Sequence, residues 1–332
     1  MPINTDISIK IVDTPFHRDE PVKESPFDRY TRLATIIIGQ TLLAATIISL
    51  AAVIFTPSPI SATILAISAI ALTLLLLKEI LPLVIPHLPE PLRTAANYIW
   101  GGVTELAAVI YSAAVYPLGL INNDPTSLPP DTKKATLLVH GFLHNRSGWY
   151  YMEDRLKAEN IGPIFTVNLG SPFHTIEENA AIVAKRVAEI KEMARTEILE
   201  IDIVAHSMGG PISSEFVSQL DPNSGIKVKS ITTLGSPLAV SGAPIANIAR
   251  FCPCANQMRP GSECLVNLNK KIQKVTGTKF FHLGFGVDLV VPPKSTFFEF
   301  NKSNYKLFTH LGHLGALYSK PVADSVINAI RS

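Results

Sequence analysis

The chain contains little cysteine and little charge. Its 332 residues include only 3 cysteines, and Asp, Glu, Lys and Arg together make up 17% of the sequence. Three cysteines are too few for a small fold held together by disulfides, and 19 glycines are too few for a collagen-like repeat. The formal net charge of +2 produces no strong electric field, so we expect no nucleic-acid partner.

Apolar residues are in excess, and they are unevenly distributed. Hydrophobic residues make up 47% of the chain and the mean hydropathy is +0.27, which excludes general intrinsic disorder. Residues 1–32 are polar and mixed in charge, and they predict a loose tail. Residues 33–55 and residues 60–77 are two runs without a single charged residue. The short stretch between them contains two prolines, which cannot continue a helix.

The two runs predict a helical hairpin that crosses a membrane within residues 33–85. The first run, at 23 residues, is long enough to span about 30 Å of hydrocarbon as a helix. Arg29 and Arg32 precede the hairpin, Lys78 follows it, and the turn contains no Lys or Arg. The positive-inside rule therefore predicts a multi-pass membrane protein whose later domain lies on the cytoplasmic side. The alternatives are a buried pair of core helices and a cleaved signal sequence.

Residues 86–132 predict a connector that contains one more apolar helix. Residues 92–121 are mostly apolar but include Arg93, Glu105 and two adjacent glycines. This mixture predicts an interfacial helix that packs on the bilayer or on the next domain. The alternative is a third membrane span, which would invert the sidedness of everything that follows it.

Residues 133–332 predict one α/β domain. Short apolar runs typical of buried strands alternate there with amphipathic stretches typical of helices. Thr175 and Glu178 have the spacing of a helix-starting capping box. This alternation predicts a mostly parallel sheet with helices on both faces. The predicted strands are residues 135–140, 164–169, 198–205, 228–234 and 279–284, and the predicted helices are residues 149–160, 175–195, 209–220 and 321–330.

One motif predicts a nucleophile at the end of a strand. The sequence Ala205-His206-Ser207-Met208-Gly209-Gly210 follows an apolar strand and precedes a helix. That context is the one a nucleophile elbow needs, because the turn is tight and its flanking residues must be small. The turn lifts the Ser207 hydroxyl above the sheet edge. The backbone N–H of Met208 can then stabilise a developing oxyanion at the start of the helix.

Three other segments complete this candidate site. Phe142 follows the first predicted strand of the domain, and its N–H is the second expected oxyanion donor. Asp288 comes just after a predicted strand, and His313 lies in a loop before the last helix, with His310 as the alternative base. A neutral hydroxyl needs an adjacent imidazole base, and the imidazole needs a carboxylate that orients it. His140 is expected to hold the Phe142 loop by hydrogen bonds rather than to act as a base.

These stretches resemble the bacterial lipase branch of the α/β-hydrolases. The resemblance rests on the blocks VHGF, AHSMGG, TLGSP, GVDLVVP and GHLGALYS, in this order over residues 133–332, and it is closest to small lipases whose elbow begins with Ala. The resemblance implies an α/β-hydrolase fold and no metal or organic cofactor. It also implies Ser207 as nucleophile, Asp288 as acid, His313 as base, and Phe142 with Met208 as oxyanion donors.

The expected function is therefore that of a membrane-anchored serine ester hydrolase, with a lipid or other acyl ester as substrate. An acyltransferase or thioesterase with the same three residues is one alternative. A non-catalytic protein that tethers or remodels membranes is another, because paired hydrophobic helices with a minimal turn are similar to inclusion-membrane proteins of some intracellular bacterial pathogens.

The remaining features carry weaker expectations. Cys252, Cys254 and Cys264 are expected to be free thiols; three zinc ligands or one disulfide are the alternatives. Residues 238–275 form a long insertion that is either a mobile cap over the site or a rigid surface excursion. Asp202 is expected to be solvated or to cap a helix.

Overall fold

A computed structural model of the chain describes residues 10–12, 89–171, 173–298, 300–301 and 304–332. The predicted membrane hairpin, residues 33–77, lies outside the described residues. Within the described part, one helical stretch, Glu90–Leu120, is long and apolar enough to cross a membrane.

The centre of the fold is a seven-stranded sheet in which every pairing is parallel. The spatial order is β1-β7-β6-β5-β4-β2-β3, so β4 lies between β5 and β2 and away from both edges. This sheet confirms the predicted α/β class, and the architecture is α/β-hydrolase-like. The strands are β1 (Lys10–Val12), β2 (Lys134–Val139), β3 (Ile164–Val167), β4 (Leu199–His206), β5 (Ile226–Leu234), β6 (Lys279–Phe285) and β7 (Tyr305–Phe308).

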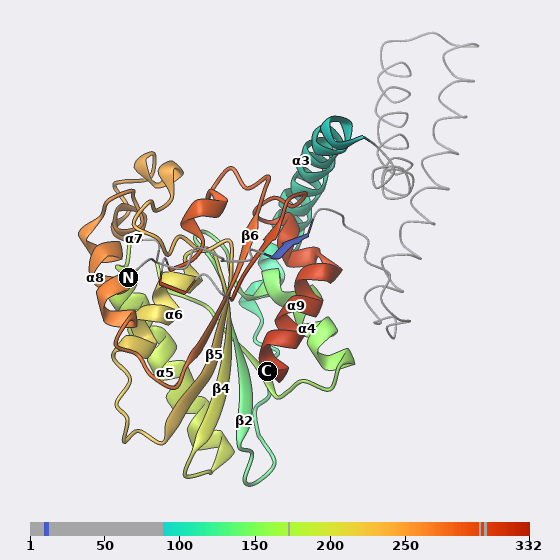
Figure 1. Ribbon diagram of the computed structural model, residues 1–332. Helices are drawn as coiled ribbons and strands as arrows, with labels where there is room; N and C mark the ends of the chain where they lie inside the picture. The colour runs from blue at the N-terminus through green and yellow to red at the C-terminus, as the bar shows by residue number, and fades with distance from the viewer. Residues whose placement is uncertain (1–9, 13–88, 172, 299, 302–303) are drawn as a thin grey trace, which may run out of the picture.

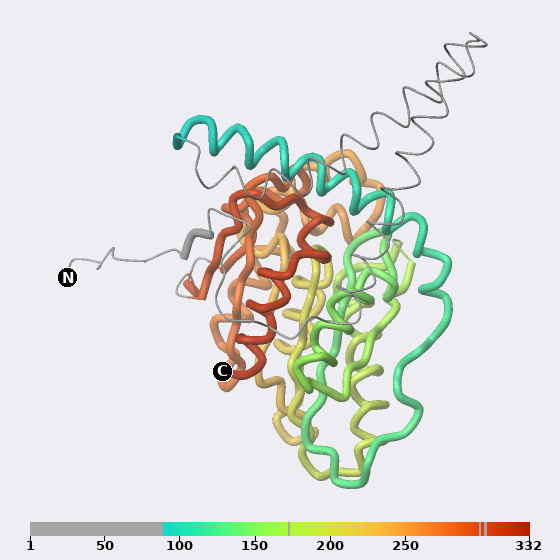
Figure 2. The backbone as a smooth tube through the Cα atoms, turned by 90° about the vertical axis from the view of Figure 1, so that its right-hand side faces the viewer, coloured from blue at the N-terminus to red at the C-terminus, as the bar shows by residue number. Residues whose placement is uncertain are grey.

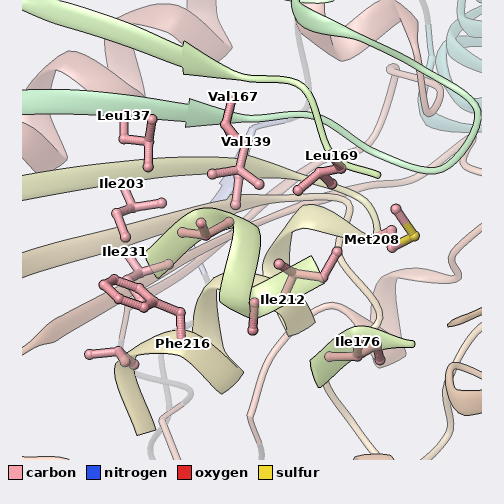
Figure 3. Packing of buried hydrophobic residues seen from close by; sticks show 14 of the residues in the cluster. Leu137, Val139, Val167, Leu169, Ile176, Ile203, Met208, Ile212, Phe216 and Ile231 are labelled. Carbon is pink, nitrogen blue, oxygen red and sulfur yellow. The ribbon is translucent and has the colours of Figure 1, made fainter. Parts of the chain in front are cut away.

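Helices cover both faces of the sheet (Figure 1). Side chains of a strand point alternately to its two faces, so Leu137 and Leu138 enter two separate cores. The core that contains Leu137 also holds apolar side chains of α5 and α6 (Figure 3), and the core that contains Leu138 holds those of α4 and α9. The helices are α3 (Glu90–Val115), α4 (Tyr150–Ala158), α5 (Ile176–Ala194), α6 (Gly209–Ser218), α7 (Pro253–Gln257), α8 (Glu263–Ile272) and α9 (Lys320–Arg331).

The capping box at the start of α5 is confirmed. Thr175 Oγ1 accepts a hydrogen bond from the N–H of Glu178, and the Glu178 carboxylate accepts one from the N–H of Thr175. The insertion of residues 238–275 is anchored in the main core, because Cys254 of α7 and Leu268 of α8 are buried there.

Two elements from before residue 133 pack against the predicted α/β domain. The apolar helix α3 packs on the hydrolase-like domain, and Figure 2 shows it in cyan along one end of the domain, beside the red segments near the C-terminus. Strand β1 pairs with β7 at the edge of the sheet, with Lys10 opposite Lys306 and Val12 opposite Phe308. The sequence predicts only a loose tail around β1, and it does not predict β7.

Candidate active site

Ser207 occupies the sharp turn between β4 and α6. Its φ angle is 53°, in the left-handed region that residues other than glycine rarely adopt. The N–H of Ser207 donates to the Leu234 carbonyl at 2.9 Å, and the N–H of Gly210 donates to the Ser207 carbonyl at 3.0 Å. These bonds fix the turn on the neighbouring strand β5, so the strained backbone holds the serine at the end of the sheet.

Two glycines make room for this turn. A Cβ atom on Gly209 would lie 2.5 Å from the Val139 carbonyl oxygen and 2.8 Å from that of His140. A Cβ atom on Gly141 would lie 2.8 Å from the Cβ of Ser207. The backbone that follows β2 therefore runs directly beside the serine, which is possible only with small residues at these positions.

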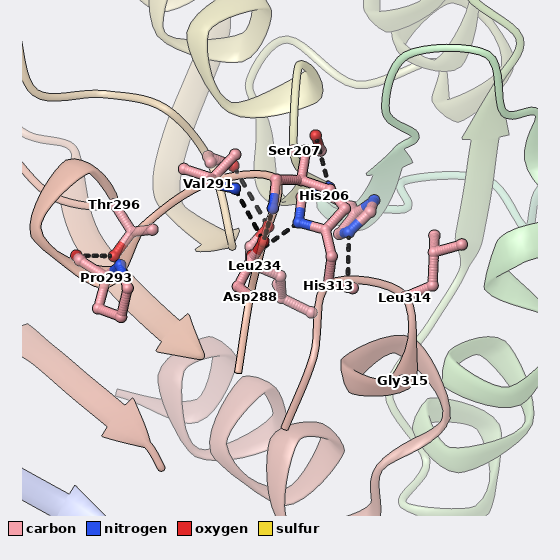
Figure 4. Close-up of polar contacts among 12 residues, drawn as sticks. His206, Ser207, Leu234, Asp288, Val291, Pro293, Thr296, His313, Leu314 and Gly315 are labelled. Atoms are coloured by element: carbon pink, nitrogen blue, oxygen red, sulfur yellow. Dashed lines mark hydrogen bonds and ion pairs between the residues drawn. The ribbon is translucent and has the colours of Figure 1, made fainter. Parts of the chain in front are cut away.

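Ser207, His313 and Asp288 form one hydrogen-bonded chain (Figure 4). Ser207 Oγ lies 2.9 Å from His313 Nε2, and His313 Nδ1 lies 2.7 Å from Asp288 Oδ2. The three residues are nearly buried, at 7%, 6% and 6% exposed. The structure thus brings together the three predicted residues, and it places His313 rather than His310 between the hydroxyl and the carboxylate.

Both oxygens of the Asp288 carboxylate accept hydrogen bonds. Oδ1 accepts hydrogen bonds from the N–H groups of Val290 and Val291, each at 2.8 Å, while Oδ2 faces His313. Gly235, with a φ of +54°, lies so close that a Cβ atom there would come within 3.1 Å of Oδ2. The loop after β6 and the turn after β5 therefore orient the carboxylate toward the imidazole.

The surroundings of His313 tune its basicity. Burial on its own lowers the pKa of the imidazole, but the charge and hydrogen bond of Asp288, followed by the charge of Glu105, outweigh burial and raise the pKa above its usual value. Because the carboxylate accepts at Nδ1, this nitrogen carries the proton in the neutral ring. Nε2 is then free to accept the hydroxyl proton of Ser207.

The two predicted oxyanion donors flank the serine. Met208 directly follows Ser207 as the N-cap of α6, and Phe142 follows Gly141, whose backbone touches Ser207. Among the described residues, neither the N–H of Phe142 nor that of Met208 donates to a protein acceptor. Leu143 has a φ of 51°, so the loop after Phe142 turns sharply. Two unused N–H groups beside a serine hydroxyl form the arrangement that could stabilise an oxyanion.

His140 holds this loop, as predicted. Its Nδ1 donates to the Gly141 carbonyl at 2.8 Å, and its Nε2 accepts from the N–H of Leu169 at 2.9 Å. Burial lowers the pKa of His140 to about 4, so the ring stays neutral at physiological pH. Both nitrogens are occupied by backbone groups, which leaves neither of them for proton transfer.

His206 is a residue whose role the sequence did not reveal. Its Nε2 lies 3.1 Å from the His313 carbonyl oxygen and donates to it. The ring is fully buried, and burial keeps its pKa well below the usual value. The only signal in the sequence was its position inside the elbow motif, where the general pattern accepts any residue.

The cysteines take no part in the hydrogen bonds that join Ser207, His313 and Asp288. Cys252, Cys254 and Cys264 form no disulfide bond, and burial raises the pKa of Cys254 to about 11 and that of Cys264 to about 12. In the part of the chain that the structure describes, no three His, Cys, Asp or Glu side chains gather in a way that could hold a metal ion.

Comparison with known proteins gives a partial family match. Residues 157–258, which include β4, Ser207 and α6, match the model of a PGAP1-like alpha/beta domain. The match covers less than a third of the 332 residues. No curated protein sequence matches the chain.

Several solved structures are similar in fold. Mature lipase BlEst2 of Bacillus licheniformis is similar over 62% of this chain and 97% of its own, with 16% identity and a TM-score of 0.48. Lipase B of Aspergillus fumigatus is similar over 63% of this chain and 55% of its own, with 14% identity and a TM-score of 0.48. Phospholipase PlaB of Legionella pneumophila is similar over 46% of this chain and 38% of its own, with 14% identity and a TM-score of 0.39. This chain therefore spans less than two thirds of the lipase B and PlaB chains.

These likenesses concern the fold and define neither substrate nor mechanism for this chain. The sheet order, the elbow at Ser207 and the partial family match agree with one another. Together they give the chain an α/β-hydrolase-like fold.

Proposed function

We propose that this protein is a serine ester hydrolase that cleaves lipid acyl esters at a membrane surface. The observation that carries the proposal is the unbroken hydrogen-bond chain from Ser207 through His313 to Asp288. Such a chain turns a weakly nucleophilic hydroxyl into one that can attack a carbonyl, because the base is oriented and its charged form is stabilised.

The proposed reaction proceeds through an acyl-enzyme. Ser207 Oγ attacks the ester carbonyl while its proton passes to His313 Nε2, and Asp288 stabilises the imidazolium. The N–H groups of Phe142 and Met208 donate to the oxyanion. The C–O bond to the alcohol then breaks, and the alcohol leaves with the proton from His313. Water repeats the sequence on the acyl-enzyme and releases the fatty acid.

Exposed apolar side chains on the segments that follow the strands support a lipid substrate. They lie on loops that follow parallel strands, and the carboxyl ends of parallel strands share one edge of the sheet. Large exposed apolar groups of this kind mark surfaces that meet a partner or a membrane. We call these five residues the apolar rim: Leu143, Phe173, Ile248, Phe251 and Leu289, which is 89% exposed and adjacent to Asp288.

The outer face of α3 extends the apolar surface. Ile99, Leu106 and Ile110 are spaced so that they share one face of the helix, and all three are exposed. We propose that this face and the apolar rim contact lipid. We also propose that residues 33–77 anchor the chain as a hairpin with the hydrolase domain on the cytoplasmic side. An anchor of this kind raises the local concentration of an insoluble substrate.

Covalent labelling tests the proposed nucleophile. Full-length protein in detergent is treated with a fluorophosphonate probe, next to a known lipase as positive control. We expect wild type to be labelled and Ser207→Ala to be unlabelled. Ser218→Ala, which removes a hydroxyl of α6 that donates to the Glu215 carbonyl, is the matched control and should be labelled like wild type. An unlabelled wild type, or a labelled Ser207→Ala, would contradict the proposal.

Product analysis separates hydrolysis from acyl transfer. An acyl-enzyme can form from an oxygen ester or a thioester and can be resolved by water or by an alcohol, so untreated wild-type enzyme is given a phospholipid, a triacylglycerol and an acyl thioester. An alcohol acceptor is present in half of the reactions. We expect free fatty acid from the oxygen esters with or without the acceptor. A product formed only by transfer to the alcohol would identify an acyltransferase instead, and a chain that is inactive on all substrates would favour a tethering role.

A further inference from the structure

Helix α3 lies directly against the loops that carry the acid and the base. A Cβ atom on Gly101 would come within 2.7 Å of Val287 Cγ2 and 2.9 Å of the His310 carbonyl oxygen, so the helix backbone touches both loops. Near the other end of the contact, Ser112 Oγ lies 2.8 Å from the Tyr318 hydroxyl. Figure 2 shows the same arrangement, with α3 alongside the C-terminal segments.

Glu105 is the one acidic side chain on the contact face of α3, and it is bonded to the His313 loop. The N–H of Leu314 lies 2.9 Å from each Glu105 oxygen, and the N–H of Gly315 lies 2.8 Å from Oε2. These are the two amides that immediately follow His313. A Cβ atom on Gly312 would lie 2.5 Å from Oε2, so the loop wraps closely around the carboxylate.

The bonds to Glu105 complete the attachment of His313. The imidazole is held at Nδ1 by Asp288, the carbonyl is held by His206, and the next two amides are held by Glu105. Hydrogen bonds from amides to a charged acceptor are stronger than those to a neutral one. In the described part of the chain, the Glu105 carboxylate is the only acceptor of these two amides, so its loss frees the backbone on the C-terminal side of the base.

We infer that Glu105 is a positioning residue for His313, and that α3 is thereby a working part of the active site rather than a connector. This inference rests on the proposed function, because it concerns the base of the proposed reaction. Glu105 contacts no reacting atom, so it acts through the placement of the His313 backbone. A shift of about 1 Å in a reacting group can lower a rate by about 100-fold.

A second consequence is electrostatic. The charged or titratable groups that face His313 are Asp288 from the β6 loop, His206 from β4 and Glu105 from α3. The negative charge of Glu105 helps to raise the pKa of His313. Removal of that charge therefore lowers the pKa of the base and moves the acidic limb of the pH–rate profile to lower pH.

The test uses full-length protein in detergent with a soluble short-chain ester, assayed from pH 5 to pH 9. We expect Glu105→Gln to lower kcat by about 10-fold or more with little change in KM, and to move the acidic limb to lower pH. Glu105→Asp keeps the charge but is too short to reach both amides, so kcat falls while the limb stays near its wild-type position. Glu90→Gln, at the exposed start of the same helix, should match wild type in both readouts.

Hydrogen exchange at the amides of Leu314 and Gly315 shows whether the contact exists. We expect faster exchange at both positions in Glu105→Gln, with global unfolding unchanged. Faster exchange together with a wild-type kcat and pH limb would overturn the inference, as would unchanged exchange. If Glu105→Gln does not fold, the test rests on Glu105→Asp. A wild-type kcat in Glu105→Asp would overturn the inference that Glu105 positions His313.

Failure of the proposed function has a different signature. A wild-type protein that no fluorophosphonate labels would refute the serine hydrolase, whatever Glu105 does. A labelled wild type whose labelling rate is unchanged in Glu105→Gln would refute only the role of Glu105.

Discussion

The His206 side chain donates a hydrogen bond to the carbonyl of His313, and the two imidazole rings lie with their centres 4.6 Å apart. The residue before Ser207 thus holds the backbone of His313. The same tight turn that holds Ser207 at the end of the sheet therefore also fixes the distance between Ser207 and His313.

His206→Phe keeps a ring in this position but removes the donor. We expect it to destabilise the protein by about 1–3 kcal/mol, because a buried carbonyl loses its partner. We also expect it to lower kcat on a soluble ester. Activity and denaturant unfolding are measured on the same preparation. His282→Phe, which removes a bond from another buried histidine to Thr233, is the matched control and should lower stability but not kcat. Equal kcat values in the two variants would show that His206 does not position the base.

Gly141→Ala places a methyl group against Ser207. We expect a loss of about 100-fold in kcat/KM, because the serine or the Phe142 loop must move by a substantial fraction of an ångström. Gly102→Ala is the control, because nothing lies within 4 Å of its added Cβ atom and alanine is favoured in a helix. The rates of ester hydrolysis and of fluorophosphonate labelling are measured for both variants. A labelling rate in Gly141→Ala equal to that of Gly102→Ala would contradict the close approach.

Asp288→Asn removes the charge that opposes the effect of burial on His313. The pKa of His313 in wild type is raised, so its base form appears only above the usual value near 6.5. In the variant the pKa falls and the acidic limb moves to lower pH, while kcat drops by on the order of 10⁴-fold because the ring loses its orienting partner. Asp221→Asn, on an exposed turn, serves as control. The pH–rate profiles of both variants are measured between pH 5 and pH 9. An acidic limb in Asp288→Asn at the wild-type pH would contradict the proposal that Asp288 raises the pKa of His313.

Buried neutral histidines make stability depend on pH. Burial lowers the pKa of His282 to about 3 and that of His140 to about 4, whereas both titrate near 6.5 in the unfolded chain. Their contribution to stability is therefore complete above pH 6.5 and is lost as the pH falls toward 4 and 3. We expect His282→Phe to reduce the slope of unfolding free energy against pH by about 1.4 kcal/mol per pH unit near pH 5. Denaturant unfolding at pH 7, 6 and 5 measures it; identical slopes in wild type and variant would contradict the burial of a neutral ring.

The outer face of α3 predicts a difference between soluble and membrane substrates. We expect the double variant Leu106→Ser, Ile110→Ser to lose activity toward lipid in vesicles by several-fold, because two exposed side chains that contact lipid become polar. Activity toward a soluble short-chain ester should stay at the wild-type level. Equal losses on the two substrates would indicate damage to the site rather than to a lipid contact.

Much of the fold could be predicted because the central strands are continuous apolar runs. Residues 135–140 and 201–205 are buried on both faces, and their mostly apolar composition is typical of strands of a parallel sheet. The elbow at Ser207 was predictable because tight turns demand small residues at fixed positions. Chain order then identified Asp288 and His313, which the structure brings together with Ser207.

The remaining features depend on contacts between distant residues. Strand β7 has a mixed pattern, with Lys306 inside it, and its identity follows from pairing with β6. The sequence predicts that Asp202 is solvated or caps a helix, but it is buried within β4 and accepts a hydrogen bond from Ser230 Oγ at 2.5 Å, and burial raises its pKa. Glu105 was visible as a rare charge in an apolar stretch. Its partner lies 209 residues away, so only the fold could identify it.

Strand β1 constrains where two distant parts of the sequence can lie. Lys10–Val12 pair with β7, and α3 packs on the same domain, so β1 and α3 lie on the same side of any bilayer. A membrane between β1 and β7 would break the pairing that joins them.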